Sequence, residues 1–240
     1  MYPVLLICVY LNLFYGSTKS DENNCGLSRQ VLKHAFVSMN IKKSGFHREL
    51  VTTVEFSPEA PNRLRILLSY RFPSGLYIDP YQLAPQKEDQ DVQVLLNSAI
   101  DVETPAHMSA GFTALVYMSL VGKKLKFPIL IHGRYHKPSL TEENFQFVQI
   151  ELPKLMFKAD NCIPVHLLPP HNIVDAPCTA VNISMCQWLN IQNLQEHRHV
   201  TLEMPLGDES VVNSVCAGTL LVTLLCCVVL SRRILKNGQC

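Results

Sequence analysis

Residues 211–230 read VVNSVCAGTLLVTLLCCVVL and contain no charged side chain. At a rise of 1.5 Å per residue, twenty helical residues span about 30 Å, which is the thickness of the hydrocarbon core of a bilayer. The stretch therefore predicts a single transmembrane helix over residues 211–231.

The charges that flank this stretch predict its orientation. Asp208 and Glu209 come just before it, and a basic cluster comes just after it, formed by Arg232, Arg233 and Lys236. Because basic residues favour the cytosolic side, we expect a cytosolic tail over residues 232–240 and a luminal domain before the helix. A glycosylphosphatidylinositol (GPI) attachment signal would end on its apolar run, whereas here a basic tail follows.

The N-terminus has the pattern of a secretory signal. An apolar run over residues 4–14 is followed by small and polar residues over 16–20, and the run is too short to cross a bilayer. No Lys or Arg precedes the run, so a buried core strand is the alternative. We predict a signal peptide over residues 1–20 and one luminal β-rich domain over residues 21–210 of a type I membrane protein.

The charge of the predicted domain gives no support for a nucleic-acid partner. All 20 acidic residues and 17 of the 21 basic residues lie between Asp21 and Glu209, which gives this part a net charge of about −3. Nucleic-acid-binding domains normally show a basic patch or stripe. The sequence gives no indication of nucleic-acid binding.

The domain has the pattern of an all-β fold. Short runs of β-branched and aromatic residues are separated by Pro, Gly, Asn or charged clusters, which is typical of a β-sandwich. Pro128 falls inside one run and predicts an edge strand or a bulge there. Residues 30–42 have a loose spacing compatible with a short helix. The strands are expected at residues 51–56, 64–72, 92–96, 112–120, 127–135, 145–152 and 200–204.

Four cysteines belong to the predicted luminal domain, namely Cys25, Cys162, Cys178 and Cys186. An even number in an oxidising compartment predicts two disulfides, for which three connectivities are possible. Zinc binding is the alternative, but no C-x-x-C or C-x-x-H spacing occurs. We expect no metal and no cofactor.

The remaining chemical motifs are weak. His132 and His136 have the i, i+4 spacing of a helical metal site, but the apolar run before them favours a strand, where packed or hydrogen-bonded histidines are the simpler reading. Residues 73–81 alternate turn formers with aromatic residues, as in a binding groove or a loop folded onto a sheet. No G-x-S-x-G or phosphate-binding glycine loop occurs, so nothing favours a hydrolase.

Five segments, in order, resemble the phosphatidylinositol-glycan biosynthesis class X family. The most recognisable element is R-Y-H-x-P at Arg134, Tyr135, His136 and Pro138, whereas residues 101–126 carry no such motif. With the terminal apolar helix, the resemblance runs over most of residues 40–235. The segments are residues 45–50, 74–81, 132–138, 176–178 with 186–188, and 201–207.

The resemblance implies a non-catalytic stabilising subunit of GPI mannosyltransferase I in the endoplasmic reticulum membrane. Its partner would be the multi-spanning catalytic subunit, which adds the first mannose to the GPI precursor from dolichol-phosphate-mannose. One membrane span offers no cavity for such a donor, which agrees with an accessory role. A cell-surface adhesion or receptor-like module of the same topology and a luminal hydrolase are the alternatives.

We expect the segment that holds Arg134, Tyr135, His136 and Pro138 to bind the partner and to perform no chemistry. It follows a strand-like run and ends at a proline, and loops at strand ends often carry recognition. Arg and Tyr are also enriched at interface hot spots. The alternative is that Tyr135 packs in the core and Arg134 pairs with a nearby carboxylate.

The sequon Asn182-Ile183-Ser184 yields a first prediction. In the secretory pathway the mature chain should start near residues 17–21 and carry one glycan on Asn182. Endoglycosidase treatment should then increase its gel mobility, and Asn182→Gln should abolish that shift. A wild-type chain whose mobility does not respond to endoglycosidase would show that this sequon is not used.

Overall fold

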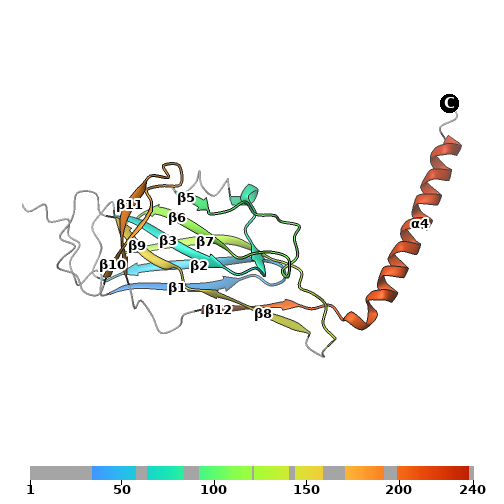
Figure 1. Ribbon diagram of the computed structural model, residues 1–240, viewed down its shortest axis with the longest axis horizontal. Coiled ribbons are helices and arrows are strands. Elements are labelled where there is room, and N and C mark those ends of the chain that lie inside the picture. Colours follow the sequence, from blue (N-terminus) through green and yellow to red (C-terminus); the bar gives the residue numbers. More distant parts are fainter. Residues whose placement is uncertain are drawn as a thin grey trace, which may run out of the picture.

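The computed structural model describes most of the C-terminal four-fifths of the chain (Figure 1). The predicted signal peptide, residues 1–20, lies outside the described part, as do Cys25 and Cys162. A strand-rich body carries one long helix at its C-terminal end. The residues described are 34–57, 64–83, 92–120, 122–140, 144–158, 171–191 and 199–237.

Twelve strands precede the helix within this part, and the seven strands expected from the sequence are among them as β2, β3, β5, β6, β7, β8 and β12. The mainly β fold class is therefore confirmed. In chain order the elements are β1 (Ala35–Lys42), β2 (His47–Phe56), β3 (Arg65–Phe72), β4 (Leu76–Tyr77), β5 (Gln93–Leu96), β6 (Phe112–Ser119), β7 (Lys124–Gly133), β8 (Phe145–Glu151), β9 (Lys154–Lys158), β10 (His171–Pro177), β11 (Met185–Ile191), β12 (His199–Pro205), η2 (Glu209–Val211) and α4 (Val212–Asn237).

The strands form two main sheets and a two-stranded ribbon. One sheet has the order β1-β2-β7-β4, the other has the order β10-β11-β9-β3-β6-β5, and β12 pairs with β8 in the ribbon. The pairings between these strands are antiparallel. Apolar side chains from both sheets and from the ribbon share one buried cluster, so the two sheets face each other as a sandwich.

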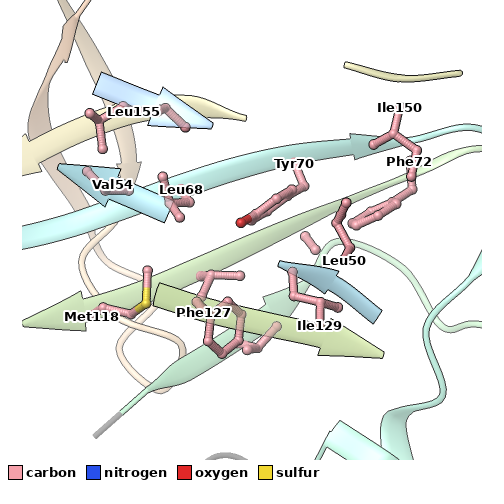
Figure 2. Packing of buried hydrophobic residues seen from close by; sticks show 14 of the residues in the cluster. Leu50, Val54, Leu68, Tyr70, Phe72, Met118, Phe127, Ile129, Ile150 and Leu155 are labelled. Carbon is pink, nitrogen blue, oxygen red and sulfur yellow. The ribbon is translucent and has the colours of Figure 1, made fainter. Parts of the chain in front are cut away.

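The core follows from the period-two alternation of the strands. In β2 every second residue from Leu50 to Phe56 is buried. The Phe56 ring packs edge-on against Phe157 of β9, with 5.5 Å between the ring centroids, and so joins the two sheets. Burial of such a side chain stabilises the fold by about 1.5–3 kcal/mol. Figure 2 shows further core side chains, including Leu50 and Val54 of β2, Phe127 and Ile129 of β7, and Leu68, Tyr70 and Phe72 of β3.

The sequence was compatible with a short helix over residues 30–42. This expectation is wrong for the part that the structure describes, because residues 35–42 form strand β1. Alternate positions of β1 carry Ala35, Val37, Met39 and Ile41, which all pack on the core. The strand pairs with β2 over its whole length. Pairing with β2 and an apolar face of period two therefore override the weak helical spacing.

Pro128 lies on β7 opposite Val51 of β2. The other neighbour of β7 is β4, which pairs only with His132 and Gly133. At Pro128 β7 is thus an edge strand on that side, within the described strands, as the missing N–H of proline requires. This confirms the expectation of an edge.

Strands β9, β10 and β11 were not predicted, and they complete the six-stranded sheet. On its outer face Trp188 of β11 is buried against Tyr117, with ring centroids 5.9 Å apart, and against Leu67 and Met156. The Tyr117 hydroxyl donates a hydrogen bond to the Pro177 carbonyl at 3.0 Å. This second cluster fixes the β10–β11 hairpin to the sheet.

The hairpin is closed by a disulfide between Cys178 and Cys186, one of the pairings that the sequence left open. Asn182 is exposed at its tip, where its side-chain oxygen accepts a hydrogen bond from the Ser184 backbone N–H at 3.0 Å. Thr179 donates its backbone N–H to the Asn182 carbonyl. The sequon thus sits on an accessible, ordered turn.

Helix α4 follows the short η2 turn, whose N-cap Asp208 accepts a hydrogen bond from the Ser210 N–H. No residue of α4 is buried, although its sequence is strongly apolar. Together the two elements are long and apolar enough to cross a membrane, and the mean hydropathy of their apolar 18-residue stretch is 2.3. The helix continues through Arg232 and Arg233 to Asn237, beyond the predicted end of the span.

The hairpin gives a second prediction, with Trp188 as its reporter because it is the only tryptophan of the chain. Replacing both Cys178 and Cys186 by Ser should lower the free energy of unfolding by about 2–3 kcal/mol, since a short closed loop constrains the unfolded chain. Urea unfolding followed by tryptophan fluorescence measures this. An unchanged midpoint would show that the crosslink does not support the hairpin.

Candidate functional site

The candidate site lies where β7 ends at Gly133. A Cβ at this glycine would stand 2.4 Å from the Met204 sulfur and 3.2 Å from the Phe46 ring, so a side chain here would force the buried Met204 side chain of β12 to move. The chain then leaves the sheet as residues 134–140, here called the 134–140 loop. This loop contains all four residues predicted to bind a partner.

Arg134 is buried beneath the surface, with only 4% of its area exposed. Its backbone N–H donates to the Gly75 carbonyl at 2.9 Å, and its guanidinium Nη1 donates to the Thr104 carbonyl at 2.6 Å. The guanidinium carbon also lies 4.9 Å from the centre of the Tyr77 ring. Arg134 therefore connects three segments that are far apart in the sequence.

Burial lowers the pKa of the Arg134 guanidinium, and the nearby Asp101 carboxylate acts in the opposite direction. Arginine nonetheless stays charged at neutral pH. The alternative was that Arg134 pairs directly with a carboxylate. In the structure its guanidinium instead donates to a backbone oxygen, the Thr104 carbonyl. Asp101 acts on Arg134 through the electrostatic effect of its carboxylate, without a hydrogen bond.

The loop over residues 101–106 is the part of the site that the sequence did not reveal. Asp101 accepts hydrogen bonds from the Glu103 N–H at 2.9 Å and from the Thr104 hydroxyl, and these bonds lower the pKa of its carboxyl group. Ala106 donates its N–H to the Tyr135 carbonyl at 2.9 Å. The spacing D-x-x-T was the available signal, since Asp and Thr side chains favour such turns.

The other predicted residues lie nearer the surface. Tyr135 is 74% exposed, and its ring centroid lies 4.9 Å from that of Phe46. The alternative in which Tyr135 packs in the core is therefore wrong. Lys137 is exposed, whereas His136 and Pro138 are half-buried. Burial lowers the pKa of His136, and the nearby His107 lowers it further.

Hydrogen bonds tie the 134–140 loop to the start of the apolar helix. The Ser139 N–H donates to the Gly207 carbonyl at 2.9 Å, and the Glu209 N–H donates to the Ser139 carbonyl at 3.0 Å. Pro138 contacts Gly207, where a Cβ would lie 3.7 Å from its ring. The loop is thus held within a few residues of Val212, at which α4 begins.

A cavity of about 510 Å³ opens beside the loop, within the usual size range of ligand sites. The 134–140 loop forms one wall, and the edge of β8 forms another. Gly75 lies at its inner side, where a Cβ would come within 3.1 Å of the His136 ring and 2.9 Å of Val148. The lining residues are Pro73, Ser74, Gly75, Ala106, His107, His136, Lys137, Pro138, Ser139, Gln146, Phe147, Val148, Gln149 and Leu206.

The sequence of residues 73–81 left two interpretations open, a binding groove and a loop folded onto a sheet, and the structure has features of both. Leu76 and Ile78 are buried, and Leu76–Tyr77 pair with the end of β7 as strand β4, as expected of a loop folded onto a sheet. Its first residues, Pro73 to Gly75, also line the cavity.

His132 is a packed and hydrogen-bonded side chain, as the simpler interpretation of its sequence expected. Its Nε2 lies 2.9 Å from the Gln82 side-chain oxygen, and its ring stacks on Tyr77 with 4.8 Å between centroids. Burial lowers the pKa of His132, and His47 beside it lowers it further. In the part of the chain that the structure describes, no three His, Cys, Asp or Glu side chains gather as a metal site would require.

Comparison with known proteins gives concordant matches. The sequence model of the PIG-X / PBN1 family matches residues 43–235. The human protein named GPI alpha-1,4-mannosyltransferase I, stabilizing subunit (Homo sapiens) is 29% identical over 217 residues, which cover 88% of this chain and 84% of the relative. The protein of that name from Rattus norvegicus is 28% identical over 226 residues, covering 92% and 87%.

The relative of the same name from Mus musculus is 29% identical over 231 residues, which cover 94% of this chain and 88% of the relative. No solved structure gives a significant match. The family match includes β2 to β12, the 134–140 loop and nearly all of the apolar helix. This chain belongs to the PIG-X / PBN1 family.

Proposed function

We propose that this chain is a non-catalytic stabilising subunit of GPI mannosyltransferase I in the endoplasmic reticulum. Its partner is the multi-spanning catalytic subunit, which transfers the first mannose from dolichol-phosphate-mannose to the GPI precursor. The names of the human, rat and mouse relatives support this assignment. They do not favour the cell-surface adhesion or receptor-like alternative.

In this proposal the chain is a type I membrane protein. Residues 1–20 are removed as a signal peptide, residues 21–210 form the luminal domain, residues 211–231 cross the bilayer and residues 232–240 face the cytosol. The charge bias across the apolar stretch supports this orientation. The disulfide between Cys178 and Cys186 supports it as well, because disulfides persist in oxidising compartments.

The observation that carries the proposal is the attachment of the 134–140 loop to the start of α4 through Ser139. A membrane-embedded partner presents its luminal loops close to the bilayer surface. A recognition surface for those loops must therefore lie near the point where α4 enters the membrane. The exposed side chains of Tyr135 and Lys137 satisfy this condition.

Within the loop the residues have different tasks. Tyr135 and Lys137 contact the catalytic subunit, with His136 and Pro138 completing the surface. Arg134 is buried, so it acts by positioning the loop. A rigid aromatic side chain held on an ordered loop loses little conformational entropy on binding, which is the reason that tyrosine is frequent at interface hot spots.

A third prediction separates contact from positioning. Tyr135→Ala should leave the domain folded and lower the amount of co-purified catalytic subunit at least fivefold. Arg134→Ala should lower the free energy of unfolding by about 2–3 kcal/mol, because it removes a charged hydrogen bond and a cation–π contact. Denaturant unfolding and immunoblotting of the partner measure the two effects.

Tyr81→Ala is the matched control, because Tyr81 is a tyrosine 87% exposed in a helical turn outside the 134–140 loop. It should change neither stability nor partner recovery. If Tyr135→Ala retains the catalytic subunit at the wild-type level, the 134–140 loop is not the contact surface.

A further inference from the structure

Within the described part of the chain, strand β8 has one edge without a partner strand. It pairs with β12 on one side, and among the strands that the structure describes no other pairs with it. The chain over residues 154–158 does pair with β3, as strand β9, but this ladder ends at Ser69 opposite Lys154. Pro153 lies at the point where β8 departs from β3. Strand β8 therefore diverges from β3 beyond this point.

The hydrogen-bond register shows which groups of β8 face away from β12. Leu206 donates its N–H to the Asn144 carbonyl at 2.9 Å, so even-numbered residues of β8 are the ones bonded to β12. The backbone groups of Phe147 and Gln149 then point towards the free edge. The Arg48 side chain donates to the Glu203 carbonyl at 2.6 Å, which confirms that the odd-numbered residues of β12 also face outward.

This free edge borders the cavity beside the 134–140 loop, which Phe147 and Gln149 line. The edge residues 146–149 extend for about 13 Å at the rise of a strand. The cavity volume of about 510 Å³ lies within the range that accommodates ligands. A short stretch of extended chain fits such a space.

The chemistry of the lining favours a peptide over a lipid phosphate. Free N–H and C=O groups alternate along a strand edge, so they match another backbone, whereas a phosphate only accepts hydrogen bonds. Lys137, His107 and His136 also line the cavity, and no Asp or Glu is among its lining residues. An acidic side chain on an inserted segment would therefore be electrostatically favourable.

We propose that this cavity accepts an extended segment with an acidic side chain, supplied by a luminal loop of the membrane-embedded catalytic subunit. The segment adds as a third strand to the free edge of β8. The proximity of the cavity to the start of α4, through Leu206 and Ser139, places the edge within reach of such loops. This inference rests on the proposed function, because that function supplies the partner.

Proline scanning tests the inference in the full-length chain co-expressed with the catalytic subunit. Gln149→Pro removes an N–H that faces the cavity and leaves the bonds to β12 intact. Thr201→Pro is the matched control, since Thr201 pairs with Gln149 and its N–H faces the opposite edge. Gln149→Pro should lower partner recovery in detergent at least fivefold, and Thr201→Pro should keep it within twofold of wild type.

A photo-crosslinking residue at Phe147 gives a readout that does not depend on the proline variants. It should form an adduct with a peptide of the catalytic subunit. Adducts only with lipid, or only with another part of this chain, would overturn the inference even if Gln149→Pro failed to fold. Equal partner recovery by Gln149→Pro and Thr201→Pro, both folded, would also overturn it.

Failure of the proposed function can be distinguished from failure of the strand addition. If the wild-type chain recovers no multi-spanning subunit, the proposed function is wrong and the strand addition falls with it. If the wild-type chain and Gln149→Pro recover that subunit equally, only the strand addition is wrong.

Discussion

Two backbone hydrogen bonds at Ser139 join the end of the sandwich to the start of the apolar helix. Through them the 134–140 loop, the ribbon of β8 and β12, and the η2 turn form one connected region. The helix is long and apolar enough to cross a bilayer. In the proposed topology, in which it does so, this region lies beside the membrane. The cavity and the exposed Tyr135 are located there for the same reason.

Buried contacts behind the loop make the exposed surface possible. Arg134 lies inside the domain and holds the loop over residues 101–106 through the Thr104 carbonyl. Gly133 leaves space for the Met204 side chain, and Gly75 leaves space for the His136 ring. The side chains that face outward can then be held in place by groups that never reach the surface, as a pre-organised binding site requires.

The sequence predicted the features that depend on local patterns. Short β-branched and aromatic runs between turn-forming or charged residues identified the seven strands, and an uncharged stretch of twenty residues identified the apolar helix. It did not predict that Arg134 would be buried, because its partners at Thr104 and Gly75 are supplied by other loops. Strand β1 was missed because its pairing with β2 outweighs its weak local signal.

Placement of the recognition region at the membrane can be tested with an insertion between Val211 and Val212. Ten Gly and Ser residues would separate η2 from α4 by about 17 Å on average while keeping the Ser139 hydrogen bonds. The half-life of the catalytic subunit is then measured in cells that express only this variant. If the recognition region must lie at the membrane surface, the half-life should be as short as in cells without the chain. An unchanged half-life would contradict this placement.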